Sequence, residues 1–382
     1  MQMSAQNYQK DFASFGGKIW LNAASEGPLP LAADKALRQA VEWKMKPYLL
    51  DMGKFVTTVT GLKRSIGQLL GVDEADVILG NSASYGLHLL ANGIPWEKGD
   101  EILTMQNDFP TNILPWLALE QKGVVVRQIK PKGRVLEPEE LRKFVSARTR
   151  LLCLSHVHTF SGYVLDVDGF AKICKEKEII FVLNLSQSLG AMPVDVGKFS
   201  ADAVVSAGYK WLCGPYGTGF CWIKPSLRKA LTLNQAYWAA MLSKEDLLEE
   251  CPLKLKDVQS ARRFDIFGTA NFFNHVPLKT AIDYWLDSGL ENVKAYHDIL
   301  VDRFIAGLQG PGYELISPEK GKRRSSIVVF SHADRNRNTQ IYEILLSRGI
   351  YTALWKGNIR VAPHVYNTAR EIDQTIKALG EI

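Results

Sequence analysis

Cysteine is scarce in this sequence and shows no functional spacing. The five cysteines are Cys153, Cys174, Cys213, Cys221 and Cys251. Their spacing fits neither a zinc site nor a disulfide framework, so we expect reduced thiols and no metal. Cys153 and Cys221 lie in apolar, strand-like runs, which is typical of small core residues.

Long apolar runs and charge of one sign are also lacking. No run of eighteen apolar residues occurs, and the first twenty residues contain no apolar signal core. The 46 basic residues exceed the 40 acidic ones by only six. The one dense basic cluster, residues 320–324, is more typical of a solvated loop than of a nucleic-acid-binding surface. We therefore expect a cytoplasmic protein without a nucleic-acid or membrane partner.

The sequence does contain enough apolar material for a large core, since 46% of its 382 residues are hydrophobic. From about residue 60, short apolar strands alternate with helical segments, among them 62–70 and 111–120. The expected strands are 76–80, 101–105, 124–129, 150–157, 179–185, 203–206 and 219–223. This alternation predicts an α/β fold with a mainly parallel sheet covered on both faces.

A second, smaller domain is expected toward the C-terminus. A long helical segment near 275–310 precedes a strand-like run at 325–330 and a final helix from Ala369. We therefore divide the chain into an N-terminal segment at 1–30 that contributes to the small domain and the site, a large domain at 31–275, and a small α+β domain at 276–382.

Lys210 carries the strongest chemical signal. It follows the apolar run at 203–205 and precedes a glycine-rich turn at 214–219. A lysine held there away from water has a lowered pKa, and its uncharged amine can attack an aldehyde. A lone lysine before a turn is more often a solvated surface group, so the neighbouring strand ends must decide between the two interpretations.

Two strand ends offer partners, because ligands of open α/β sheets collect at the carboxyl ends of the strands. After the strand at 76–80, Ser82, Ala83 and Ser84 begin a helix whose free N–H groups and hydroxyls suit a phosphate. An ordinary serine N-cap explains the same residues. After the strand at 101–105, Phe109 is placed to stack on a flat ring, or to pack as a core aromatic.

Two further strand ends add polar side chains. His156, His158 and Thr159 lie at the end of the strand at 150–157, without a third ligand at metal spacing. Asn184 and Gln187 follow the strand at 179–185 and place two amides at the sheet edge, where loop hydrogen bonding is the alternative.

In combination these motifs resemble the class V aminotransferase group of fold-type I pyridoxal-phosphate enzymes, which includes cysteine desulfurases, kynureninase and isopenicillin N epimerase-like proteins. The resemblance runs from Leu21-Asn22-Ala23-Ala24 to the segment Arg360-Val361-Ala362-Pro363-His364-Val365-Tyr366-Asn367-Thr368. Its most specific part is Asn184-Leu185-Ser186-Gln187, followed by Pro193-Val194-Asp195 and then Lys210. It implies the family's fold, with a mainly parallel seven-stranded sheet, and pyridoxal 5'-phosphate as cofactor.

The resemblance also implies roles for single residues. Lys210 would form the Schiff base with the cofactor, and Arg360 would bind the carboxylate of an amino-acid substrate, with Asn22 beside it. Thr269 would reach the phosphate from the neighbouring subunit, which implies a homodimer with shared sites. The remaining cofactor contacts would come from Ala83 and Ser84 with Tyr209 at the phosphate, Phe109 over the ring, Asn184 at the ring nitrogen, and Gln187 near Thr159 or His158 at the phenolic oxygen.

The chain departs from the family pattern at two places. The family normally has an aspartate at the position of Asn184, which keeps the ring nitrogen protonated. A charge-assisted hydrogen bond contributes about 1.5–3 kcal/mol against about 1 kcal/mol for a neutral one, so the asparagine weakens the ring as an electron acceptor. Between Phe330 and Arg360 there is also no cysteine, which the persulfide chemistry of desulfurases requires.

We therefore expect an enzyme that acts on an α-amino acid or a related amine, of the aminotransferase type. An epimerase or a β-lyase without a catalytic cysteine is the alternative that Asn184 favours, and a cofactor-binding protein with weakened turnover is another. The substrate cannot be identified from the sequence. Four residues are candidates for a side-chain pocket and equally for core packing: Tyr85, His88, Trp238 and Trp355.

Overall fold

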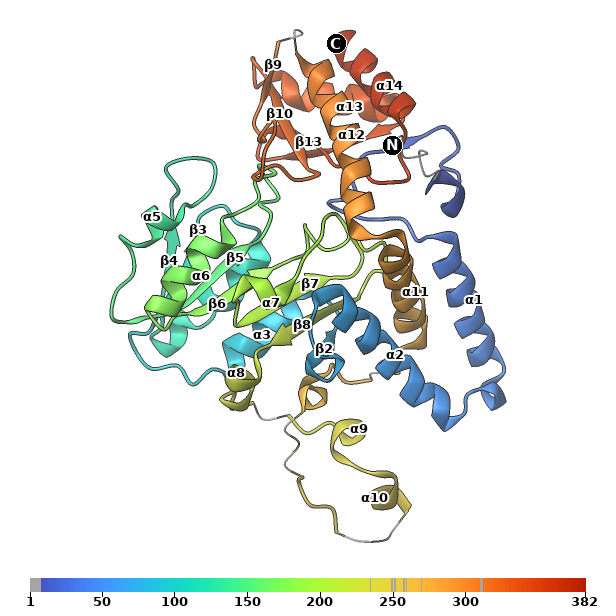
Figure 1. The fold of residues 1–382 in the computed structure, drawn as a ribbon, viewed down its shortest axis with the longest axis vertical. Coiled ribbons are helices and arrows are strands. Elements are labelled where there is room, and N and C mark those ends of the chain that lie inside the picture. The colour runs from blue at the N-terminus through green and yellow to red at the C-terminus, as the bar shows by residue number, and fades with distance from the viewer. Residues whose placement is uncertain are drawn as a thin grey trace.

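The alternating apolar segments form a seven-stranded sheet at the centre of the large domain (Figure 1). The computed structural model describes residues 8–233, 235–248, 250, 252–256, 258, 260–268, 270–309 and 312–382. The strands are β2 (Val77–Gly80), β3 (Glu101–Met105), β4 (Val125–Ile129), β5 (Thr149–Ser155), β6 (Ile180–Asn184), β7 (Ala203–Ala207) and β8 (Gly219–Ile223). Their order is β2-β8-β7-β6-β5-β3-β4, and only β8 runs antiparallel to its neighbours. The predicted, mainly parallel sheet is confirmed.

Successive residues of each strand face two separate cores, which explains why the strands are apolar throughout. In β5, Leu152 and Leu154 join the core that also contains residues of α2 and α6. Leu151 and Cys153 join the core on the other face, which contains residues of α3. The longer helices of the large domain are α1 (Leu31–Met45), α2 (Met52–Leu70), α3 (Ala83–Gly93), α6 (Val167–Glu176) and α11 (Phe272–Ser288).

Short helical turns make the remaining connections. They are η1 (Tyr8–Asp11), η2 (Pro47–Leu49), η3 (Glu74–Asp76), η4 (Pro110–Asn112), α4 (Leu114–Leu117), η5 (Glu120–Lys122), α5 (Pro138–Leu141), α7 (Val196–Phe199), α8 (Pro225–Lys229), α9 (Trp238–Met241), α10 (Lys244–Leu248) and η6 (Ala261–Phe264). The predicted helix at 111–120 is therefore wrong, because that stretch is divided among η4, α4 and η5. Pro115 explains the break after η4, since proline has no N–H and fits only the first turn of a helix.

The smaller C-terminal domain contains an antiparallel sheet and three helices, as expected. The sheet has the order β12-β13-β10-β9. Its strands are β9 (Tyr313–Leu315), β10 (Val328–His332), β12 (Ala353–Trp355) and β13 (Asn358–Val361), and its helices are α12 (Leu290–Leu308), α13 (Arg337–Ser347) and α14 (Ala369–Gly380). The long helical segment is two helices, because Gly289 with φ +75° separates α11 from α12.

The N-terminal segment joins this smaller domain. Its strand β1 (Ile19–Trp20) pairs in parallel with β11 (Ile350–Tyr351), and Asn22 forms a bridge with Ala362. In contrast, α11 packs against α1 and α2 of the large domain. The exact division of the chain at residues 30 and 275 stays a prediction.

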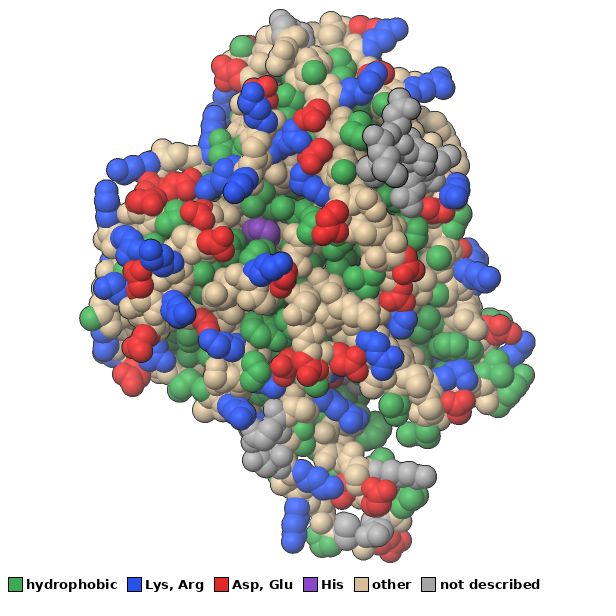
Figure 2. Space-filling model, viewed as in Figure 1, with side chains coloured by type: hydrophobic (Ala, Val, Ile, Leu, Met, Phe, Trp, Pro, Cys, Tyr) green, Lys and Arg blue, Asp and Glu red, His purple; other side chains and the backbone are tan. Residues whose placement is uncertain are grey.

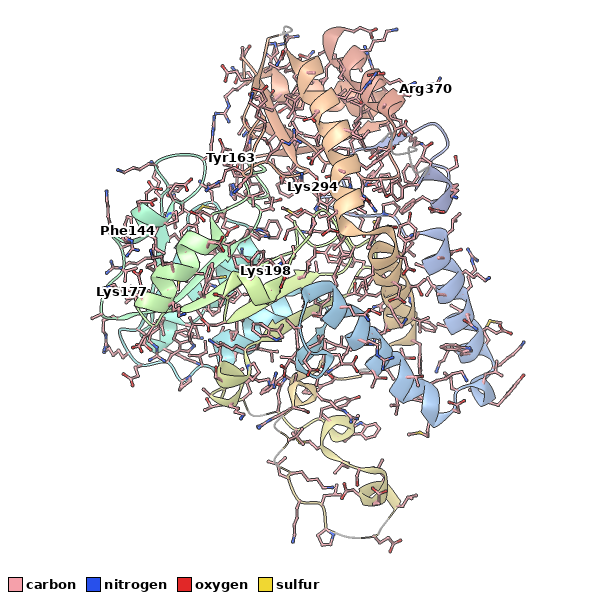
Figure 3. The ribbon with its side chains drawn as sticks, viewed as in Figure 1. Phe144, Tyr163, Lys177, Lys198, Lys294 and Arg370 are labelled. Atoms are coloured by element: carbon pink, nitrogen blue, oxygen red, sulfur yellow. The ribbon has the colours of Figure 1, made fainter. Side chains whose placement is uncertain are left out.

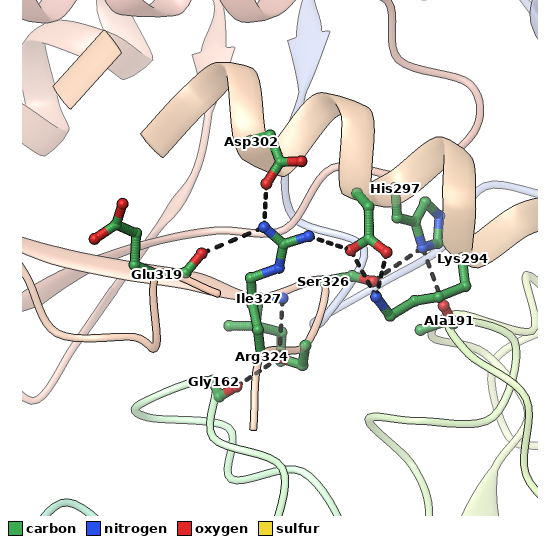
Figure 4. Close-up of polar contacts among 11 residues, drawn as sticks. Gly162, Ala191, Lys294, His297, Asp302, Glu319, Arg324, Ser326 and Ile327 are labelled. Carbon is green, nitrogen blue, oxygen red and sulfur yellow. Dashed lines mark hydrogen bonds and ion pairs between the residues drawn. The ribbon is translucent and has the colours of Figure 1, made fainter. Parts of the chain in front are cut away.

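A polar network links α12 to the loops below it (Figure 4). Arg324 binds Asp302 and lies 2.6 Å from Asp298, which also pairs with Lys294. His297 lies 3.0 Å from the Ser326 hydroxyl. One arginine of the basic cluster at 320–324 is therefore used within the fold. A second, Arg323, forms two hydrogen bonds with Glu137.

The surface mixes both signs of charge. Figure 2 shows acidic and basic side chains interspersed over the visible face. Within the described residues, no helix has the length and apolar composition to cross a bilayer. The same residues contain no group of three or more potential metal ligands.

Candidate active site

Lys210 lies just beyond the end of β7 and is 9% exposed. Its Nζ is 5.0 Å from the centre of the Phe109 ring. The N-terminal segment covers it, because the Gly27 N–H donates to the carbonyl of Tyr209 at 2.9 Å. A Cβ on Gly27 would lie 2.0 Å from the Lys210 carbonyl oxygen, so only glycine allows this approach. No local pattern pointed to Gly27, because this contact joins segments that are far apart in the chain.

Burial lowers the pKa of the Lys210 amine to about 8. The nearby Arg360 guanidinium contributes to this lowering, and the Glu26 carboxylate partly opposes it. The pKa of Glu26 is itself raised by burial. Glu26 also lines an apolar cleft of about 380 Å³ with Trp20 and Tyr351. The uncharged form of Lys210 is thus far more populated near neutral pH than that of an ordinary lysine, as nucleophilic or general-base chemistry requires.

Arg360 on β13 extends toward this region and is 3% exposed. Its Nη1 donates to the Thr159 hydroxyl at 2.6 Å, and its Nη2 donates to Asn22 Oδ1 at 3.1 Å and to the Ser25 hydroxyl at 2.7 Å. Its Nε has no hydrogen-bond partner among the described residues, and burial lowers the pKa of the guanidinium to about 10. A buried cation with only neutral partners is a fitting receptor for an anion.

Gln187 connects the arginine to the sheet. Its Nε2 donates to the Thr159 hydroxyl at 3.1 Å and to the Ala24 carbonyl at 2.9 Å. Its Oε1 accepts from the Trp211 indole at 2.8 Å. Of the two alternatives beside Gln187, the structure therefore places Thr159 in contact with it. His158 instead bonds the Ser161 hydroxyl and the Asn107 carbonyl.

Asn184 ends β6 and is 6% exposed. Its Nδ2 donates to Asn112 Oδ1 at 2.8 Å, and its Oδ1 accepts from the Ser186 N–H at 3.0 Å. Asn112 was not among the predicted site residues, although it belongs to the same segment as Phe109. The pairing of η4 with the end of β6 joins residues 72 positions apart, so no local sequence pattern revealed it.

The start of α3 leaves hydrogen-bond donors without a side-chain cap. Ala83 is its first residue, and Ser82 makes no side-chain cap, so the first N–H groups of the helix remain available. The Ser84 hydroxyl lies 3.0 Å from the Thr111 hydroxyl. The Tyr209 ring packs 4.6 Å from the ring of Tyr216. These donors fit a phosphate group, and Thr111 is an addition to the predicted set.

Tyr85, His88 and Trp238 are not brought into this cluster, whereas Trp355 packs against Phe160, which in turn packs against Phe109. Thr269 lies outside the described residues. The Tyr85 hydroxyl donates to the Phe264 carbonyl at 2.8 Å, and burial raises the pKa of Tyr85 to about 12. His88 is exposed on α3, as are Trp238 and Trp355 on other elements. Tyr85 thus serves core packing, which the sequence left open.

A family model described as aminotransferase class-V matches residues 49–377. The chain belongs to this family. The class-V assignment confirms the expected family and identifies the chain as an aminotransferase-like enzyme with pyridoxal phosphate as cofactor. The buried amine, the uncapped helix start and the unpaired Arg360 Nε all fit that cofactor and an anionic substrate.

Curated class-V relatives align over nearly the whole chain. A probable cysteine desulfurase of Methanothermobacter thermautotrophicus is 23% identical and covers 100% of this chain and 98% of its own length. The kynureninase of Pseudomonas fluorescens is 24% identical, over 100% of this chain and 93% of its own length. The isopenicillin N epimerase of Streptomyces clavuligerus is 22% identical, over 95% of this chain and 94% of its own length.

Solved structures show the same fold. A lysine-to-alanine mutant of C-DES, with glycine covalently linked to its pyridoxal-phosphate cofactor, superimposes with a TM-score of 0.88 at 18% identity, over 98% of this chain and 99% of that chain. The apo cysteine desulfurase of Thermococcus onnurineus has a TM-score of 0.86 at 21% identity, over 100% of this chain and 98% of that chain. The likeness confirms the α/β fold with its smaller C-terminal domain.

The lowered pKa of Lys210 predicts an unusual labelling curve. In competitive acetylation of the cofactor-free protein across pH, Lys210 should reach half-maximal reactivity near pH 8, because only the uncharged amine reacts. Lys198 on α7, whose side chain is 82% exposed, is the internal control for labelling of a surface amine (Figure 3). Replacement of Arg360 by glutamine removes a positive charge and should raise the midpoint of Lys210, whereas Glu26→Gln should lower it. Coincident curves for Lys210 and Lys198 would contradict the burial argument.

Proposed function

We propose that the chain is a pyridoxal-phosphate enzyme that acts on an α-amino acid through Lys210. The observation that carries the proposal is the buried Lys210 amine, with its pKa of about 8, beside the Phe109 ring. When bound, the cofactor supplies an aldehyde that amines join as Schiff bases, and a ring that withdraws electron density from the substrate α-carbon.

The residues around Lys210 would contact four parts of the cofactor. Phe109 offers an aromatic face over the ring, and Asn184 offers a polar group at the ring nitrogen. Gln187 offers an amide at the phenolic oxygen. The phosphate would lie against the first turn of α3, where Ala83 N–H, Ser84 and Tyr209 are donors.

Lys210 and Arg360 have different roles toward the substrate. Arg360 binds the α-carboxylate through its planar guanidinium, and Asn22 and Thr159 orient that group. Lys210, shielded from water and with a lowered pKa, accepts the proton of the α-carbon in its uncharged form and returns it. The reaction types differ in the fate of this proton. It can return to the same face of the α-carbon, go to another atom or not return at all.

Transamination is the first candidate, and epimerisation or β-elimination is the second. Asn184 favours the second, because an amide cannot supply the charge that stabilises a protonated ring nitrogen. A ring with weaker electron withdrawal would handicap transamination more than epimerisation or elimination. Desulfurase chemistry is disfavoured, because residues 331–359 contain no cysteine.

We also propose that the enzyme is a homodimer. Large apolar side chains are exposed on the segment that extends from the large domain around α9 and α10 (Figure 1), among them Leu248 at 73%, Leu253 at 66% and Leu255 at 75%. Tyr48 in η2 and Met52 at the start of α2 are exposed as well. A second copy is the partner that the family resemblance implies, and Thr269 would then act across the interface.

The covalent role of Lys210 can be tested directly. Borohydride treatment of the loaded protein should fix cofactor mass on the peptide that contains Lys210, detected by mass spectrometry. Lys210→Ala should abolish this adduct and turnover, whereas Lys198→Ala should change neither. A panel of amino acids in deuterated water, read for keto acid, ammonia and inversion, then assigns the reaction type. Unchanged borohydride trapping in Lys210→Ala would refute the proposal.

The carboxylate-binding role of Arg360 predicts a binding defect limited to substrates with a carboxylate. Arg360→Gln should raise the KM for the best amino acid by roughly 10- to 100-fold, because a charged hydrogen bond contributes about 1.5–3 kcal/mol. The same variant should bind the corresponding amino-acid amide as the wild type does. Arg348→Gln, which removes a surface ion pair with Glu381, is the matched control. An equal loss for acid and amide would contradict this role.

The dimer predicts a change of mass when the exposed apolar segment is charged. Sedimentation equilibrium of the wild type should give twice the chain mass of 42.7 kDa. The double variant Leu253→Glu/Leu255→Glu should sediment as a monomer, because two charges would be buried unpaired in the interface. Ile299→Glu, at a 61% exposed position on α12, should remain dimeric. A monomeric wild type would disprove the dimer.

A further inference from the structure

Asp108 is a buried acid that the proposed function leaves without a role. It directly precedes Phe109 and is 3% exposed. Its Oδ1 accepts from the Phe109 N–H and the Ser155 hydroxyl, both at 2.7 Å. Its Oδ2 accepts from the Ser155 N–H at 2.9 Å and from Asn112 Nδ2 at 3.1 Å. Across the described residues it forms no ion pair, so these hydrogen bonds alone stabilise the carboxylate.

The carboxylate fixes the direction of Asn112. An ionised carboxylate only accepts hydrogen bonds, so the NH₂ group of Asn112 must face it. The second hydrogen of that NH₂ group is used as well, because Asn112 Nδ2 donates to the Ser155 hydroxyl at 2.8 Å. The carbonyl oxygen of Asn112 therefore points the other way, toward Asn184.

The same logic fixes Asn184. Its Nδ2 faces the Asn112 carbonyl oxygen at 2.8 Å, and its Oδ1 faces the Ser186 N–H at 3.0 Å. A reversed amide would set donor against donor at Ser186 and acceptor against acceptor at Asn112. One N–H of Asn184 is thus left for a further acceptor, and its oxygen is already engaged.

We propose that Asp108 is a positioning residue for the cofactor: through Asn112 it fixes Asn184 so that Asn184 offers an N–H to an unprotonated ring nitrogen. The inference rests on the proposed function, because it takes Asn184 as the neighbour of that nitrogen. Beyond that function, it states that two residues set the orientation of the Asn184 amide: Asn112 on η4 and Asp108 on the loop before η4.

The network also predicts what an aspartate at position 184 would do. An ionised carboxylate there would face the fixed carbonyl oxygen of Asn112, which is repulsive. A protonated carboxyl would instead donate its O–H to Asn112 and accept from the Ser186 N–H. Asn184→Asp alone should therefore give a neutral side chain and leave the ring nitrogen largely unprotonated.

Replacement of Asp108 by asparagine should release this constraint. The new amide has a donor as well as an acceptor, so Asn112 can be reversed and present its NH₂ group to position 184. In the double variant Asp108→Asn/Asn184→Asp, the new carboxyl can then ionise and hold a proton on the ring nitrogen. Asp108→Asn alone is the matched control and should leave that nitrogen unprotonated.

The test loads the four proteins with pyridoxal phosphate labelled with ¹⁵N in the ring and compares the ¹⁵N chemical shift with that of the free cofactor in acid and base. The expected result is the unprotonated position in the wild type and both single variants, and a move to the protonated position in the double variant. Infrared spectroscopy of the two cofactor-free proteins that carry Asn184→Asp is a second readout. It should show a protonated carboxyl at neutral pH in the single variant and loss of that band in the double variant.

The outcomes separate this inference from the function on which it rests. A protonated ring nitrogen in the loaded wild type, or equal protonation in Asn184→Asp and the double variant, would overturn the role of Asp108 while the enzyme assignment stands. An ionised carboxyl in cofactor-free Asn184→Asp would overturn it too. A wild type that binds no cofactor would overturn the proposed function and this inference together.

Discussion

The active site depends on removing one amine from water. Lys210 is held between the end of β7 and the N-terminal segment, where Gly27 approaches its carbonyl oxygen more closely than any other residue type allows. The resulting loss of hydration disfavours the ammonium form and brings the pKa to about 8. The segment that causes this burial is paired with the small domain through β1 and β11, so both domains contribute to the chemistry of a single side chain.

The same burial gives the site an excess of positive charge. Arg360 is enclosed by the hydroxyls of Thr159 and Ser25 and the amide of Asn22, and no acidic side chain in the described chain forms an ion pair with it. The first turn of α3 adds uncapped N–H groups at the other end of the cluster. A phosphate at one end and a carboxylate at the other would neutralise both regions, so the bound anions complete an arrangement that the protein alone leaves unbalanced.

Local sequence patterns predicted the parts of the structure that arise from local rules. The apolar strands and the glycine-rich turn after Lys210 have the period and composition of their elements, and each expected strand of the large sheet is present. The helix expected at 111–120 is broken because Pro115 outweighs the apolar periodicity. Gly27, Glu26 and Asp108 were missed because their roles come from contacts between distant segments. The roles of single residues came from the family resemblance, because hydrophobic periodicity predicts helices and strands and says nothing about the function of a side chain.

Asn184 illustrates why one departure from a family pattern does not determine the chemistry of a site. Taken alone, Asn184 replaces the carboxylate that the family normally has at this position, and the expected consequence is a weaker interaction with the ring nitrogen. In the structure, however, the neighbouring acceptor on Asn112 is itself directed by Asp108, so the position is built to receive an N–H donor. A carboxylate is still part of this network, because Asp108 accepts from Asn112, whose oxygen in turn accepts from Asn184. The relevant unit is therefore the hydrogen-bonded series from Asp108 through Asn112 to Asn184, in which each donor direction is set by the preceding residue.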